Sequence, residues 1–168
     1  MWVYIAVGCV LFAIVLLALM IFDPFARNLS RERIPDIVRN LLIQSRNGAF
    51  RRLDHRESDF WFSIERLDGS DSTAVLALRI PRRDWSVTIV QELQSTFESH
   101  GFEWVDEKDN PSLLGKVIIP VQDIWAKSSG AKGGYAARLL MDTVGLPVDA
   151  RFNMEVGGQH VYRRHEDQ

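Results

Sequence analysis

The stretch that decides the fold is residues 59–80, DFWFSIERLDGSDSTAVLALRI. Both halves of this stretch alternate between apolar and other residues, which is typical of a strand that buries one face. The turn sequence Asp68-Gly69-Ser70 separates the halves and predicts a reversal of the chain. We therefore expect two strands, residues 59–67 and 73–80, whose buried faces carry Phe60, Phe62, Ile64, Ala74, Leu76, Leu78 and Ile80.

Helical periodicity occurs on both sides of these two strands. Apolar residues recur every third or fourth position in residues 30–46 and every fourth position in residues 84–100, which predicts two amphipathic helices. A third helix is expected over residues 135–144, because Gly145 and Pro147 would end it. Shorter alternating segments predict the other strands, which are residues 50–56, 102–105, 116–121, 151–156 and, after the hairpin turn Gly157-Gly158, 159–163.

Together these elements predict one α+β domain with a mostly antiparallel sheet and helices on one face, in the order α-βββ-α-ββ-α-ββ. Up to the third helix, this order is similar to that of the chaperones of type III secretion, small domains that bind partner proteins. The similarity is one of topology and covers roughly the middle two-thirds of the chain. It implies a protein-binding domain and carries no particular chemistry.

Ahead of this domain, residues 2–22 form an apolar run without a charged residue or a proline. As a helix it would be about 32 Å long, enough to cross a hydrocarbon layer of about 30 Å. A cleaved signal peptide is the alternative, but no Lys or Arg precedes the run and no small-x-small cleavage site follows it. We expect a single-pass signal-anchor over residues 1–26 and a soluble domain over residues 27–168, ending in a polar tail, residues 164–168.

Arginines follow the apolar run, and none precedes it. By the positive-inside rule, this asymmetry places the soluble domain in the cytoplasm, on the inner face of the cell membrane. Trp2 and Tyr4 are expected at the opposite interface of the bilayer, and Arg27, Arg31 and Arg33 at the inner headgroups. In the alternative interpretation these arginines only set the topology and solvate a helix.

The composition argues against several functional classes. A net charge of −2 at pH 7 does not suit a nucleic-acid binder. Cys9, the only cysteine, lies in the apolar run, so the soluble domain can use neither a disulfide nor a cysteine ligand. The four histidines are scattered and do not indicate a metal site. No catalytic or cofactor motif is present, so we expect no cofactor and favour a non-enzymatic role.

A glycine- and lysine-rich segment, residues 127–134, is the first candidate site. Lys127 and Lys132 would supply positive charge, and Gly133-Gly134 would let a helix N-terminus approach an anion closely. The alternative for this segment is a mobile solvent loop.

Trp61 is the second candidate, because it alternates away from the apolar face of its strand. Exposed tryptophan is typical of protein-binding surfaces, although a helix that covers this face would remove the argument. Two hypotheses follow. The first is a membrane-anchored binding or accessory domain, such as a subunit or chaperone-like adaptor of a membrane complex. The second is a small-ligand, nucleotide or phosphate-binding protein, with or without enzymatic activity, that uses residues 127–134.

The anchor can be tested directly. We expect the full-length chain, with its first 26 residues intact by mass, to stay in the membrane pellet after extraction with alkaline carbonate, because a spanning helix is held by the hydrophobic effect and not by charge. Recovery of a chain that lacks about two dozen N-terminal residues from an extracytoplasmic fraction would contradict the anchor and identify a cleaved signal peptide.

Overall fold

The computed structural model describes residues 25–158 of the chain. Within this range, no helix combines the length and the apolar character needed to cross a membrane. The expected anchor, with Trp2 and Tyr4, lies outside the described residues except for its last two positions, which begin a strand. The expected polar tail also lies outside them.

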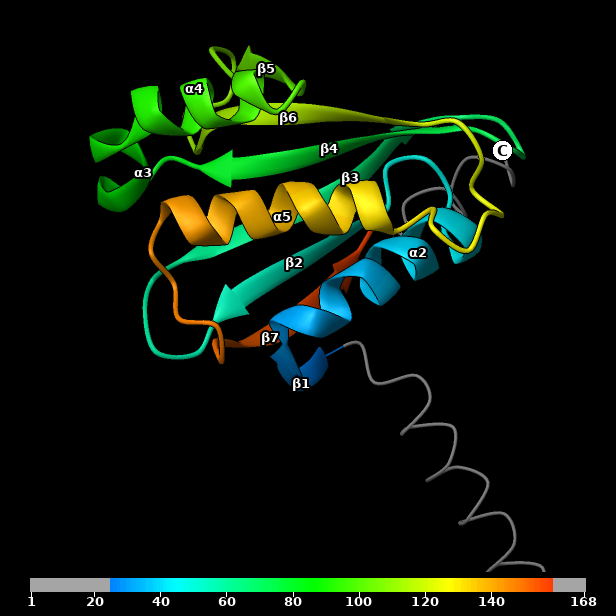
Figure 1. The fold of residues 1–168 in the computed structure, drawn as a ribbon, viewed down its shortest axis with the longest axis horizontal. Coiled ribbons are helices and arrows are strands. Elements are labelled where there is room, and N and C mark those ends of the chain that lie inside the picture. Colours follow the sequence, from blue (N-terminus) through cyan, green and yellow to red (C-terminus); the bar gives the residue numbers. More distant parts are fainter. Residues whose placement is uncertain (1–24, 159–168) are drawn as a thin grey trace, which may run out of the picture.

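A seven-stranded antiparallel sheet organises the domain (Figure 1). Its strands lie in the order β1-β7-β2-β3-β4-β6-β5, so the first and last strands of the described chain are neighbours at one edge. The strands are β1 (Phe25–Ser30), β2 (Phe50–His55), β3 (Trp61–Asp68), β4 (Ala74–Pro81), β5 (Glu103–Asp106), β6 (Leu113–Val121) and β7 (Arg151–Gly157).

The two strands predicted from residues 59–80 form the centre of this sheet. β3 and β4 pair antiparallel, with Ile64 opposite Leu78 and Arg66 opposite Leu76. The apolar residues expected on the inner face are at most 2% exposed, so the alternation predicted the correct face. Because a shift of one residue would move this whole set to the other face, burial also fixes the register.

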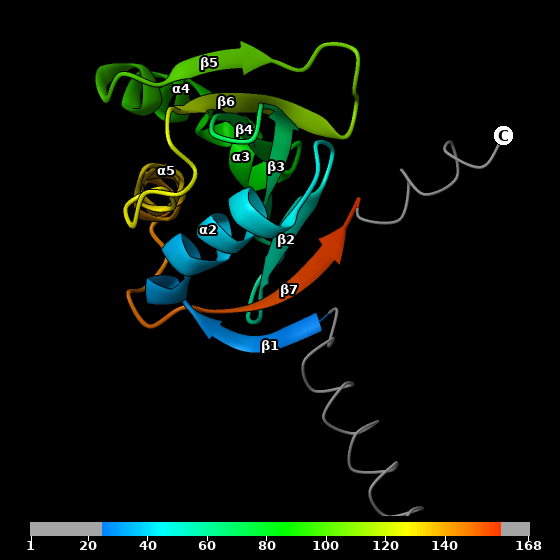
Figure 2. The ribbon, with the colours of Figure 1, turned by 90° about the vertical axis from the view of Figure 1, so that its right-hand side faces the viewer.

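Helices cover one face of the sheet, and within the described residues no helix covers the other face (Figures 1 and 2). The hydrophobic core lies between this helical layer and the inner face of the sheet. The elements of the layer are a 3₁₀ turn η1 (Arg31–Arg33) and the helices α2 (Ile34–Gln44), α3 (Asp84–Thr88), α4 (Val90–Ser99) and α5 (Ala131–Thr143).

A buried arginine of β3 holds the end of α2 against the sheet. Arg66 donates from Nη1 to the carbonyl oxygens of Leu42, at 2.6 Å, and Ser45, at 2.8 Å. A helix leaves its last carbonyls without partners, and the guanidinium satisfies two acceptors at this end. Nη2 also donates to the carbonyl of Ser70 at 3.2 Å, so the same side chain fixes the turn between β3 and β4.

The N-terminal part of the domain differs from the sequence prediction. Residues 25–30, for which no strand was predicted, form strand β1, which pairs with β7 and places Leu29 opposite Phe152. The register shifts at Asn28, whose φ is 62°, so the strand is bulged. The helix expected over residues 30–46 is therefore shorter, and the predicted order with a helix first is wrong. β1 forms because it pairs with β7, a strand at the far end of the domain. The local sequence of residues 25–30 does not show that pairing.

Within the described residues, β7 pairs with other strands than the partner predicted for it in a C-terminal hairpin. One edge of β7 pairs with β1 and the other with β2, so both hydrogen-bonding edges are filled by strands from the N-terminal third of the chain. The predicted partner strand, residues 159–163, lies outside the described residues.

Two helices have different bounds from those expected. The helix predicted over residues 84–100 is divided at Ile89, whose φ and ψ of −112° and 17° are not helical. The third helix begins earlier than predicted and contains Gly133 and Gly134. A Cβ added at Gly133 would lie 2.7 Å from Cγ1 of Val38. The glycines therefore let α5 pack closely against α2, which outweighs their low helix propensity.

This close packing leads to a stability prediction. In Gly133→Ala, overpacking against Val38 should cost about 1–3 kcal/mol, which exceeds the gain of about 1 kcal/mol in helix propensity. We expect a lower free energy of unfolding, measured by chemical denaturation of the chain in detergent. In a Val38→Ala background the same substitution should stabilise, because the new methyl group fills the cavity. A stabilised Gly133→Ala variant with Val38 intact would contradict the packing role.

Candidate functional sites

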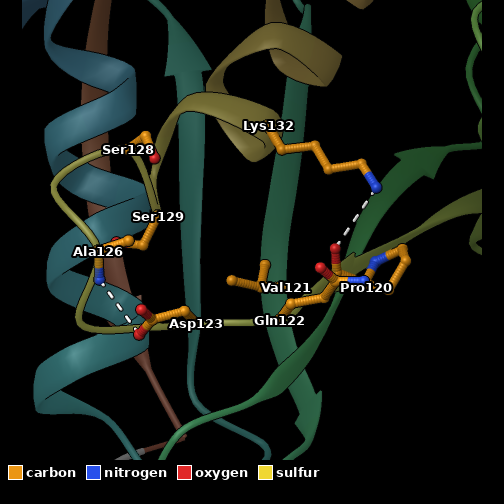
Figure 3. Close-up of a pocket in the computed structure, with 8 residues that line it drawn as sticks. All are labelled: Pro120, Val121, Gln122, Asp123, Ala126, Ser128, Ser129 and Lys132. Atoms are coloured by element: carbon orange, nitrogen blue, oxygen red, sulfur yellow. Dashed lines mark hydrogen bonds between the residues drawn. The ribbon is translucent and has the colours of Figure 1, made fainter.

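A hollow of about 340 Å³ opens where β6 leads into α5 (Figure 3). It lies at the N-terminus of α5, where the backbone N–H groups of the first turn favour an anion. The end of β6, the turn after it and the first turn of α5 supply its lining, which is Pro120, Val121, Gln122, Asp123, Ala126, Ser128, Ser129 and Lys132.

Two side chains of this hollow have spare hydrogen-bonding capacity. Lys132 extends across it (Figure 3), and its Nζ lies 3.5 Å from the carbonyl oxygen of Pro120, a weak contact that a ligand can replace. Ser129 is 5% exposed, and its Oγ has no hydrogen-bond partner among the described residues. A buried hydroxyl without a partner costs about 1–3 kcal/mol. A hydrogen-bond acceptor that occupies this hollow and reorients Ser129 would remove that cost.

Asp123 limits what the hollow can bind. It supplies the one carboxylate among the lining residues, and its Oδ1 accepts hydrogen bonds from the backbone N–H groups of Trp125, at 2.9 Å, and Ala126, at 3.3 Å. These bonds shape the turn after β6 and partly offset the negative charge. With one cation and one anion in the lining, the hollow would hold an anion weakly.

The residues predicted for this site separate in the structure. Lys132 lines the hollow, whereas Lys127 is exposed and is not a lining residue. Gly133 and Gly134 are buried inside α5 and face α2, where they permit helix packing. Ser129 was missed because its significance lies in burial without a partner, which the sequence does not show. Anion binding thus stays a prediction, carried now by Lys132 and the start of α5.

The helix-free face of the sheet presents the second site. Trp61 lies on it, half-buried, and the guanidinium carbon of Arg52 stands 4.1 Å from the centre of its ring. Asp54 holds Arg52 in place through an ion pair of 2.7 Å. The indole Nε1 of Trp61 is buried and has no hydrogen-bond partner within residues 25–158. The guanidinium of Arg52 therefore lies over the Trp61 ring, through a cation–π contact of about 0.5–1 kcal/mol at exposed sites.

Paired charges and apolar residues continue across this face. Glu65 of β3 forms an ion pair with Arg79 of β4. On the neighbouring strand β6, Lys116 lies opposite Arg79 and forms an ion pair of 2.7 Å with Glu107. Ala77 and Ile118 lie opposite each other in the neighbouring row, where Ala77 is fully buried and Ile118 is half-buried. The ion pairs therefore balance the charge of this face, and its partly exposed apolar residues are Trp61, Val75 and Ile118. Such a face is suited to a partner of mixed polarity.

The arginines near the N-terminus divide into two groups. Arg27 and Arg33 are exposed, as an interface with lipid requires. The side chain of Arg31 is only 9% exposed, forms an ion pair with Asp142 and donates to the carbonyl of Leu146 at 3.1 Å, so it joins η1 to the end of α5. Arg51 is buried, and desolvation lowers the pKa of its guanidinium below the ordinary value.

In the part of the chain that the structure describes, no group of three or more His, Cys, Asp or Glu side chains is placed to hold a metal ion. Comparisons with family models, with curated proteins and with solved structures find no match. Function must therefore be inferred from the two surfaces themselves, the hollow at α5 and the open face of the sheet.

Proposed function

We propose that this chain is a membrane-anchored, cytoplasm-facing accessory domain that binds a protein partner on the open face of its sheet. In this function the domain is a subunit or adaptor of a membrane-associated complex and catalyses no reaction. The observation that carries the proposal is the pair formed by Trp61 and Arg52, which stands uncovered by any helix of the described domain.

The residue types at this pair support protein binding. Tryptophan and arginine are enriched among the few residues that dominate the energy of protein interfaces, and such residues lie near the centre of the contact. The indole N–H of Trp61 has no hydrogen-bond partner within the described residues. When Arg52 moves off the ring, a backbone carbonyl of the protein partner would accept a hydrogen bond from this N–H. Arg52 would then be free to pair with a carboxylate of the partner.

The rest of the face fits the same function. Its ion pairs leave the face without a large net charge. Such a face does not suit a polyanion such as a nucleic acid. Its apolar residues are separated by charged ones, so the domain does not expose one continuous hydrophobic patch of the kind that leads to aggregation. A folded protein surface with both apolar and hydrogen-bonding groups is the partner that this pattern fits.

Removal of the indole tests the proposal. Trp61→Ala should reduce recovery of the partner with the tagged full-length chain in mild detergent by more than tenfold, because a central tryptophan contributes about 2 kcal/mol or more. The matched control is Trp125→Ala, since Trp125 is 60% exposed but belongs to the turn after β6. Equal recovery of the same protein with both variants would contradict the proposal.

A photo-crosslinking residue gives the same test without loss of the indole. At Val75, on the open face, it should form an adduct with the partner, whereas at Val87, exposed on α3, it should not. Adducts from Val87 alone would place the binding surface on the helical side.

A second candidate function, binding of a small phosphate-bearing ligand, is favoured by one observation. The unpaired Oγ of Ser129 lies with Lys132 at the N-terminus of α5, and these are the groups that recognise an oxyanion. The carboxylate of Asp123 in the same hollow argues for weak affinity, so we rank this function second.

Inorganic phosphate is a suitable probe for this second function. A ligand that binds only the native state stabilises it by about 2.7 kcal/mol at a concentration 100-fold above Kd. We expect phosphate to raise the melting temperature of the wild-type chain above that in chloride of equal ionic strength, and Lys132→Ala to abolish the difference. Lys127→Ala is the matched control and should retain it, because Lys127 does not line the hollow. Identical responses of the two variants would exclude the hollow.

A further inference from the structure

We infer that the β1 edge of the sheet lies along the anionic surface of the membrane, so that the sheet stands upright on the bilayer and its open face points sideways. This inference rests on the membrane anchor of the proposed function and adds an orientation and a lipid-binding surface to it. The surface consists of Arg27, Arg33, Arg56, Val148 and Arg151, and we call it the basal edge.

The length of chain between the apolar run and the sheet limits where β1 can lie. The run ends at Phe22 and β1 begins at Phe25, so only Asp23 and Pro24 separate them. Even fully extended, this connection spans only about 10 Å. The headgroup layer is about 5–8 Å thick on each side of the hydrocarbon core. The first residues of β1 therefore lie at the level of the headgroups.

Three chain segments bring cations to the same edge. Arg27 belongs to β1 itself and is exposed. Arg56, after β2, donates from Nη1 to Oδ1 of Asn28 in β1 at 3.1 Å, and its backbone N–H donates to the carbonyl of Arg151. Arg151, in β7, lies opposite Ser30 at the other end of β1. Cations therefore follow the whole length of β1, and each near an anionic surface is worth about 1 kcal/mol.

The loop after α5 extends this edge. Val148 is 86% exposed and lines a shallow hollow together with Ser30 and Arg151. In both ribbon views the loop lies beside β1, at the edge of the sheet opposite β5 (Figures 1 and 2). Arg31 fixes the loop there, because its Nη1 donates to the carbonyls of Leu146 and Pro147. An exposed apolar side chain beside arginines suits the boundary between headgroups and acyl chains.

Exposed acids occur at the basal edge as well, and the comparison with other surfaces decides the orientation. Glu32, Glu57, Asp59 and Asp149 are exposed near the four arginines, so cations and acids balance at this edge. The turn between β3 and β4, by contrast, exposes Asp68 and Asp71 and no Lys or Arg. An anionic lipid surface therefore repels this turn, whereas at the basal edge it meets arginines that balance the acids, so contact through the basal edge is the more favourable of the two.

Depth measurements on the full-length chain test the orientation. Cys9→Ser removes the only native thiol, and single cysteines at Val148, Ser72 and Ser112 then carry a nitroxide label; all three positions are exposed. The chain is placed in vesicles of phosphatidylcholine with phosphatidylglycerol. The depth of each label is measured from its accessibility to oxygen and to a water-soluble nickel chelate. We expect headgroup depth at Val148. We expect aqueous values at Ser72, in the β3–β4 turn, and at Ser112, before β6.

Either of two results would overturn the inference. In the first, the label at Ser72 lies at headgroup depth and the label at Val148 lies in water. In the second, all three labels lie in water on a chain that resists carbonate extraction. The first result would place the β3–β4 turn on the membrane, and the second would show a freely tumbling domain. A chain that carbonate extracts would refute the anchor itself before any label is measured, so the two failures are distinguishable.

Charge variants test the role of the arginines. Arg27→Gln with Arg151→Gln should move the Val148 label towards aqueous accessibility. Arg82→Gln with Arg83→Gln removes two exposed arginines between β4 and α3 and should leave the label unchanged. Equal effects of the two pairs would overturn the assignment of the lipid contact to the basal edge.

Discussion

Where α2 packs against α5, the backbone of one helix lies against side chains of the other, and the main features of the domain depend on that contact. Gly133 and Gly134 face Val38 and Pro35 with no room for a Cβ. This approach draws the helical layer tightly over β3 and β4 and closes the inner face of the sheet. It also sets where α5 begins, and therefore where the hollow beside Ser129 and Lys132 lies. The opposite face receives no helix within the described chain, and it is the face to which we assign partner binding.

The sequence predicted the elements whose signals are local. The alternation in residues 59–80 predicted the central strands and their buried face, because each residue there reports its own environment. β1 escaped prediction because its partner β7 lies at the other end of the domain, and FARNLS alone is too polar to indicate a strand. Gly133-Gly134 indicated a loop because isolated propensity disfavours glycine in helices, whereas packing against α2 requires it.

The same distinction applies to the candidate sites. Lys132 and Trp61 were predicted from residue type and position, and the structure places the first in a hollow and the second on the helix-free face. The arginines near the N-terminus were less informative, since residue type does not show which of them are committed to the fold. Arg31 and Arg51 are held by carbonyl, hydroxyl or carboxylate partners inside the domain. Only burial and hydrogen-bond geometry separate these from Arg27 and Arg33.

The position of β7 has a consequence for biosynthesis. Among the strands of residues 25–158, β1 leaves the ribosome first, and its one partner there is β7, which leaves last. The sheet therefore cannot close before nearly the whole domain has been made, and until then β1 and the outer side of β2 are unpaired edges. During this interval the unpaired edges are open to capture by other nascent chains. We expect such a protein to depend on factors that shield unfinished sheets.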